Sequence, residues 1–236
     1  MARTVHEILT DAQRIGALGL RPISEVIEHA GAFAFALPDS CHNIVDLGSG
    51  AGVPGLVVAE LRPEFHITLV DRRAKRTDAL ERAVASLGWG HRVRVVCADV
   101  AALTRQDEWR DTFDAVMSRG FGPHETTLKY SAALARPGGT VLLSEPPAGS
   151  KNRWDAAVVA AAGLERAARE RREREREMCV QVHDFPLRVF RCPQTPRGTE
   201  PRSGPMVPPP IGEAMTSERN PVGSASWGSV CAGRWR

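Results

Sequence analysis

The sequence predicts an α/β protein with a doubly wound, mostly parallel β-sheet, two N-terminal helices and a disordered C-terminal tail. Three observations lead to this class. Between residues 41 and 145, short apolar runs alternate with amphipathic segments, which is the pattern of strands and connecting helices. Glycine and proline stand where the period changes. Three of the apolar runs end at or near an aspartate, as expected where the carboxyl ends of parallel strands share one edge.

The composition is that of a globular protein. The chain has 236 residues, which suffices for one large domain or two small ones, and 42% of them are hydrophobic. The net charge of +3 permits a nucleic-acid partner without arguing for one. Five scattered cysteines without a Cys-x-x-Cys pair argue against a disulfide framework and a zinc site. Because no leader and no membrane-length apolar run is visible, we expect a soluble, cytoplasmic protein. We also expect no metal and a monomer.

Two helices are predicted ahead of the alternating region, in a segment that spans residues 1–40. The second covers residues 21–37 and starts at Pro22, because proline fits the first turn of a helix. The first covers residues 3–19, where apolar side chains recur at helical spacing. These side chains are Val5, Ile8, Leu9, Ala12 and Ile15.

A second region, residues 41–192, contains the predicted sheet and its helices. Its first strand is a short apolar run that ends at the glycines, which is typical of a strand buried on both faces of a sheet. Stop signals end the helices between them: Pro63 after the first, Gly88 after the second and a Pro-Gly-Gly sequence after the third. The strands are predicted at residues 42–47, 66–71, 92–99, 113–119 and 140–145, and the helices at 54–63, 72–88 and 124–139.

Beyond the fifth strand the periodic pattern weakens. Good helix formers over residues 150–178 predict a helix, and residues 179–185 and 187–192 predict a late pair of strands. The charges of residues 169–177 alternate in sign, which favours a solvated helix face with ion pairs over an RNA-binding arm. Residues 193–236 are rich in proline and glycine and have no apolar period, so we expect this tail to be disordered.

The stretch VDLGSGAGVPGL, residues 45–56, places four glycines at a predicted strand-to-helix turn. Glycine lets the backbone approach a ligand closely because it has no Cβ. The spacing matches the Gly-x-Gly-x-x-Gly pattern of dinucleotide-binding folds, with Asp71 in the position of the ribose-binding acid. The glycines alone therefore leave three alternatives open: a dinucleotide site, a nucleoside site without phosphate, and a tight turn without a ligand.

The aspartates at the strand ends favour S-adenosylmethionine over a dinucleotide. Asp46 precedes the glycines and can face a cationic amino group, whereas it would repel a pyrophosphate. Asp71 can accept hydrogen bonds from both ribose hydroxyls. Asp99 lies one strand further, where the adenine edge would fall. The expected cofactor is therefore S-adenosyl-L-methionine.

Five motifs, in their order and spacing, resemble the class I S-adenosylmethionine-dependent methyltransferases. They are DLGSGAGVPGL, TLVDRRAKRTDAL, CADV, FDAVMSRGFG and LARPGGTVLLSEPP. More narrowly, the Gly-Val-Pro-Gly ending of the first motif and the Ser-Arg-Gly-Phe of the fourth resemble the glucose-inhibited division protein B family, the small-subunit 16S rRNA guanine-N7 methyltransferases. The leading helices, with His29, are similar to that family's N-terminal helices, so the resemblance covers residues 3–192.

The resemblance implies a Rossmann-like fold and S-adenosylmethionine-dependent methylation of guanine N7 in small-subunit rRNA. It places Arg119 at the boundary between cofactor and substrate. We expect this side chain to act in catalysis by donating to guanine O6 or to a phosphate, and the alternative is an ion pair with a local acid. The expected cofactor-binding residues are, from the motif itself, Asp46, Gly50 and Gly52 and, from the resemblance, Gly48, Val53, Asp71, Asp99, Val100 and Arg119.

Several alternatives stay open. Phe121 can stack on an extruded base or pack in the core. Glu145 stands where the resembled family usually has a lysine, which favours a small molecule or a protein as substrate over RNA. Two further alternatives are a nucleotide-binding oxidoreductase and a binding domain that keeps the pocket but transfers nothing.

Overall fold

The structure is a computed structural model of the chain, and it describes residues 3–144, 155–166 and 187–194. These residues belong to one unit, Met1–Gly204. Within these ranges, no helix is long and apolar enough to span a membrane. Predictions that fall outside the described residues are those for Glu145, the charged run at 169–177, the strand at 179–185 and the tail beyond residue 194.

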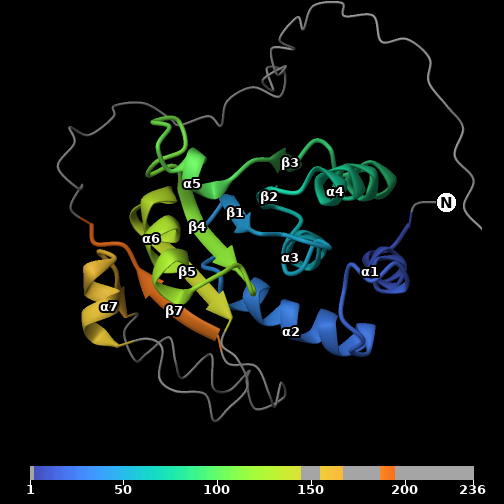
Figure 1. The fold of residues 1–236 in the computed structure, drawn as a ribbon, viewed down its shortest axis with the longest axis horizontal. Helices are drawn as coiled ribbons and strands as arrows, with labels where there is room; N and C mark the ends of the chain where they lie inside the picture. The colour runs from blue at the N-terminus through green and yellow to red at the C-terminus, as the bar shows by residue number, and fades with distance from the viewer. Residues whose placement is uncertain (1–2, 145–154, 167–186, 195–236) are drawn as a thin grey trace, which may run out of the picture. The chain divides into compact units, whose positions relative to one another are not determined.

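The described strands form one sheet (Figure 1). They are β1 (Asn43–Leu47), β2 (His66–Asp71), β3 (Val93–Cys97), β4 (Phe113–Ser118), β5 (Ala135–Ser144), β6 (Glu165–Arg166) and β7 (Leu187–Arg191). Their order is β3-β2-β1-β4-β5-β7-β6, in which β1 to β5 run parallel and β7 is antiparallel to both neighbours. The predicted doubly wound, mostly parallel sheet is confirmed. The first strand of the chain, β1, lies in the interior of the sheet, and later strands are added on both sides of it. The crossovers therefore change direction between β1 and β4.

Helices cover both faces of the sheet. One face carries α1 (Val5–Arg14), α2 (Ile23–Ala36), α3 (Gly55–Leu61) and α4 (Ala74–Leu87), and the other carries α5 (Val100–Leu103), α6 (His124–Leu134) and α7 (Ala156–Ala161) (Figure 1). Alternate strand residues supply the two cores: Ile44 packs in the first, and Val45 and Leu47 pack in the second. Because both faces of the sheet are covered, β1 is buried on both sides from Ile44 to Leu47.

The two N-terminal helices pack on the same core as α3 and α4. α1 begins with a capping box, in which the Glu7 N–H donates to Thr4 Oγ1 at 3.2 Å and the Thr4 N–H donates to the Glu7 carboxylate at 2.9 Å. The helix predicted over residues 3–19 ends early, at Arg14, because the chain turns at Gly16, whose φ is 73°. α2 begins at Ile23, one residue after the predicted start, with Pro22 as its N-cap residue.

Two other predicted helices need correction. The helix predicted over residues 124–139 ends at Leu134, and its Pro-Gly-Gly sequence instead opens β5, where the pairing with β4 shifts register. Of the helix predicted over residues 150–178, the described part contains the short α7 and then turns into β6. The single-turn helix α5 was not predicted, because four residues are too few to show a helical period.

Candidate functional site

A cavity of about 530 Å³ lies at the carboxyl ends of β1 to β4. The loops after these strands and the first turns of α6 line it. This edge of a doubly wound sheet, beside the change of crossover direction, is where such folds bind ligands. Four of the predicted cofactor-binding residues line this cavity, at the carboxyl ends of β1, β2 and β3. They are Gly48, Asp71, Asp99 and Val100.

The glycine loop between β1 and α3 borders the cavity. Gly48 lines the cavity, whereas Gly50, Gly52 and Val53 do not. Val53 is only 7% exposed and belongs to the core between the sheet and α3. A Cβ on Gly52, whose φ is +97°, would overlap the Leu56 side chain. The protein's own packing therefore requires part of the glycine content that the sequence analysis attributed to a ligand.

Gly55, the first residue of α3, is the most tightly packed glycine of the loop. An added Cβ would overlap Leu69 and come within 2.7 Å of Asp46 Oδ2, which also accepts the Gly55 N–H at 3.1 Å. We expect Gly55→Ala to lower the free energy of unfolding by ~1–3 kcal/mol, because overpacking forces core atoms apart. Chemical denaturation measures this loss. Gly90→Ala, at a position with nothing within 4 Å, is the matched control, and equal stability of the two variants would contradict the packing argument.

Asp46 is fully buried and does not line the cavity. Its Oδ2 accepts the Gly55 N–H, and its Oδ1 has no hydrogen-bond partner among the described residues. Burial raises the pKa of this carboxyl to about 7, against the opposing effects of the Gly55 N–H and the Arg119 charge. The contact of Asp46 with a cationic amino group stays a prediction, and Oδ1 is the atom that such a contact would use.

The raised pKa of Asp46 makes the stability of the fold depend on pH. An unfolded aspartate titrates near pH 4 and the folded carboxyl near pH 7, so the folded state holds the proton more tightly and stability falls as the pH rises through this window. Asp46→Asn stays neutral and keeps an acceptor for the Gly55 N–H. Its melting temperature relative to the wild type should therefore increase between about pH 5 and about pH 8, measured by thermal unfolding. A difference that is the same at both pH values would contradict the assignment.

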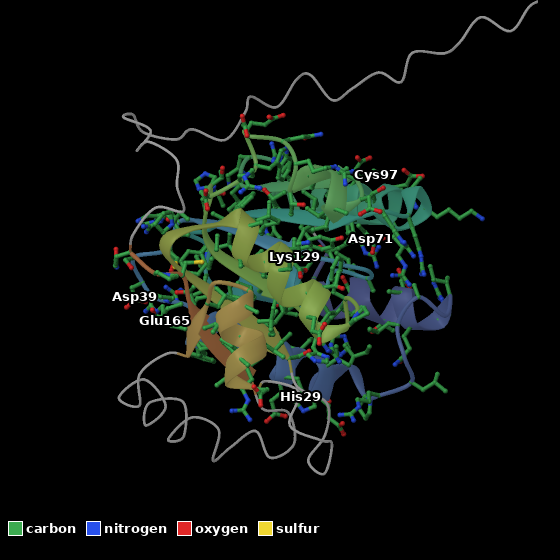
Figure 2. All side chains as sticks on the ribbon, turned by 60° about the vertical axis from the view of Figure 1, so that its left-hand side comes forward. His29, Asp39, Asp71, Cys97, Lys129 and Glu165 are labelled. Atoms are coloured by element: carbon green, nitrogen blue, oxygen red, sulfur yellow. The ribbon has the colours of Figure 1, made fainter. Side chains whose placement is uncertain are left out.

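Asp71 ends β2 and lines the cavity although it is only 5% exposed. Its Oδ2 accepts the Gly50 N–H at 3.1 Å and lies 3.4 Å from the Arg76 guanidinium, and its Oδ1 accepts the Arg73 N–H at 2.9 Å. Asp71 pairs in register with Cys97 at the end of β3, and Figure 2 labels the two residues close to each other. A carboxylate can accept about four hydrogen bonds, so these contacts orient the group and leave capacity for a hydroxyl donor.

Asp99 and Val100 follow β3 and form the next part of the cavity wall. The Asp99 carboxylate accepts the Ala101 N–H at 2.8 Å and so caps α5. Val100 is 3% exposed and packs in the core on the α5 and α6 side of the sheet. The hydrogen bond from Ala101 accounts for one carboxylate oxygen of Asp99, so this contact requires no ligand. That Asp99 and Val100 contact adenine stays a prediction.

Arg119 follows β4 directly and is half-buried. It does not itself line the cavity, although the next residues, Gly120 and Phe121, do. Burial lowers the pKa of its guanidinium, the Arg21 charge lowers it further, and the Asp46 charge opposes both. Within the described ranges, Arg119 has no hydrogen bond or ion pair of its own. The alternative role of an ion pair with a local acid is therefore not seen in this part of the chain.

The structure adds residues that the sequence analysis did not single out. Arg72, Arg73 and Arg76 line the cavity beside Asp71. They belong to the basic run after β2, within the motif TLVDRRAKRTDAL, and that run is the signal that could have identified them. Tyr130 comes from α6 on the other side, and no sequence spacing connects this helix to the loop after β2. Among the described residues, no three His, Cys, Asp or Glu side chains are grouped as a metal site requires.

Comparison with known proteins relates this chain to one family. The family model described as rRNA small subunit methyltransferase G matches residues 5–149. The chain is 31% identical over 106 residues to the ribosomal RNA small subunit methyltransferase G of Moorella thermoacetica, an alignment that covers 45% of this chain and 44% of that protein. It is 36% identical over 109 residues to the protein of the same name from Roseiflexus castenholzii, covering 46% of each. The chain thus spans less than half the length of these relatives.

Among solved structures, the fold is similar to that of an O-methyltransferase family protein from Burkholderia thailandensis. The TM-score is 0.53 at 17% identity, and the superposition covers 80% of this chain and 59% of that one. At this level of identity the likeness concerns the fold alone, because one fold hosts many functions.

Proposed function

Because the chain belongs to the rRNA small subunit methyltransferase G family, we propose that it transfers a methyl group from S-adenosylmethionine to guanine N7 of small-subunit rRNA. The observation that carries this proposal is the cavity in which the glycine loop meets the strand-end Asp71 and Asp99, at the ligand-binding edge of a doubly wound sheet. The substrate rests on the family and on the names of the aligned relatives.

The residues of the cavity suit an adenosine-containing cofactor. Its volume of about 530 Å³ lies in the range of small-molecule sites. Asp71 offers carboxylate oxygens to the ribose hydroxyls, and Val100 offers apolar surface to a base. Asp46 does not line the cavity, although its buried Oδ1 has no hydrogen-bond partner in the described part of the chain. S-adenosylmethionine, when bound, supplies an electrophilic methyl group on a sulfonium centre.

The reaction requires the protein to align the reactants and does not require an acid–base catalyst. Guanine N7 carries a free lone pair at neutral pH, so no proton has to be removed before attack. The chain has to align N7 with the methyl group and to exclude water. Arg119, where β4 ends, can donate to guanine O6 and so orient the base.

The positive charges beside the cavity favour RNA over a neutral small molecule. Arg72, Arg73 and Arg76 line the cavity, and Lys75 is exposed on the same turn. RNA carries a negative charge at each phosphate, so binding to such cations releases counterions. A small-molecule or protein substrate is the first alternative, and a weak salt dependence would favour it. A nucleotide-binding oxidoreductase is the second, and binding of a nicotinamide cofactor would favour it.

Methyl transfer from labelled S-adenosylmethionine tests the proposal when small-subunit RNA, total protein and cell metabolites are offered in parallel. We expect label in small-subunit RNA, at a rate that falls steeply as the salt concentration rises. Large-subunit RNA carries the same charge per nucleotide and serves as the control for methyl transfer that does not depend on the nucleotide sequence. Label in protein or metabolites alone would reject the RNA substrate and keep the methyltransferase. NADH binding without a response to S-adenosylmethionine, measured by calorimetry, would reject both.

A further inference from the structure

The Phe121 ring packs directly on the glycine loop. A Cβ built on Gly48 would lie 2.7 Å from Phe121 Cδ2, which is closer than two carbon atoms can approach. Phe121 follows β4 and Gly48 follows β1, and these strands are neighbours at the change of crossover direction. Both residues line the same cavity. The ring therefore stands where the cofactor cavity meets the loop that carries Arg119.

The environment of Phe121 differs from that of the core phenylalanines. Phe65 and Phe113 are at most 2% exposed, whereas Phe121 is half-buried. Its nearest aromatic partner is Tyr130, which it meets edge-on at a centroid distance of 6.4 Å and an interplanar angle of 72°. In this arrangement the edge of one ring points toward the face of the other, so the two rings do not stack face to face. Core packing therefore buries only part of the Phe121 side chain.

The backbone around Phe121 is unusually open. Gly120 and Gly122 flank it, and a Cβ on either glycine would have nothing within 4 Å. Gly120 has a φ of +64°, in the region that favours glycine. The positions before and after Phe121 in the chain are thus open, while the ring itself lies against Gly48.

The cavity has two chemically different ends. Asp71 and Asp99, which suit a ribose and an adenine, follow β2 and β3, whereas Phe121 follows β4. A target base therefore has to approach from the β4 side, past Phe121 and Arg119. Proteins hold unpaired RNA bases by stacking them on aromatic side chains.

We propose that Phe121 is a positioning residue whose ring stacks on the target guanine, while Arg119 contacts the edge of the same base. The inference rests on the proposed function and adds the residue that selects a planar, unpaired base. The ring keeps the base in the plane from which N7 reaches the methyl group. It also covers Gly48 and so keeps water from this end of the cavity.

Steady-state methylation of small-subunit RNA by three variants tests this role. Phe121→Leu keeps an apolar side chain without an aromatic face and should raise KM for RNA about tenfold, with the Kd for S-adenosylmethionine unchanged within about twofold. Phe121→Tyr keeps the face and should stay near the wild-type KM. Phe35→Leu, at an exposed phenylalanine of α2 that does not line the cavity, is the matched control and should change nothing.

The outcomes separate the inference from the proposed function. A wild-type KM for Phe121→Leu, or equal losses in the Leu and Tyr variants, would overturn the stacking role while RNA methylation stands. Loss of S-adenosylmethionine binding in step with the rise in KM would assign Phe121 to the cofactor instead. If thermal unfolding shows that Phe121→Leu is not folded, Phe121→Met repeats the test with a more adaptable side chain. A wild-type protein that methylates no RNA would overturn both proposals.

Discussion

Replacing Arg119 by alanine is expected to lower methyl transfer to small-subunit RNA about 100-fold, which corresponds to ~2.7 kcal/mol of lost transition-state stabilisation. The guanidinium is half-buried where β4 ends, next to Gly120 and Phe121 in the cavity wall. Burial removes water from the Arg119 guanidinium and thereby lowers its pKa, so the charge gains from an acceptor such as guanine O6. Single-turnover methylation rates at saturating cofactor measure the effect.

Arg119→Lys separates charge from shape. This variant should recover only part of the rate, because an ammonium group cannot reproduce the planar, two-donor fork of a guanidinium. Arg82→Ala, at an exposed arginine of α4 that does not line the cavity, is the matched control and should keep the wild-type rate. A wild-type rate for Arg119→Ala, or full recovery by lysine, would reject the proposed role.

Replacing Asp71 by alanine is expected to weaken S-adenosylmethionine binding by ~1.5–3 kcal/mol, or roughly 10- to 150-fold in Kd. The variant deletes the carboxylate that would accept the ribose hydroxyls. It also removes the acceptor of the Gly50 and Arg73 N–H groups, so the glycine loop loses a contact to β2. The Arg76 guanidinium, 3.4 Å from Oδ2, loses its carboxylate partner as well. Calorimetric titration with S-adenosylmethionine measures the loss.

Two further variants make the Asp71 experiment specific. Asp78→Ala changes an exposed aspartate on α4 and should leave the Kd unchanged. Asp71→Asn keeps one acceptor oxygen but lacks the charge, so its Kd should fall between those of the wild type and Asp71→Ala. Cofactor binding by Asp71→Ala that equals the wild type would mean that the ribose lies elsewhere.

Local signals predicted most of the fold. β2 has the predicted bounds, residues 66–71, and α4 ends at the predicted Gly88, because apolar period and stop residues act over a few neighbouring positions. The same signals failed where a longer contact decided the conformation. The Pro-Gly-Gly sequence after α6 reads as a stop signal, yet it lies within β5, between Ala135 and Thr140, which both pair with β4.

The alternation of strands and helices, the glycine loop and the aspartates at the strand ends are contained in the sequence alone, because each is a pattern of near neighbours. The strand order β3-β2-β1-β4 emerges only in three dimensions, and it brings distant segments into contact. Two contacts of the site follow from it: the Gly50 N–H donates to Asp71, and the Phe121 ring lies on Gly48. These contacts depend on burial and on the distance between side chains, which no spacing along the chain encodes.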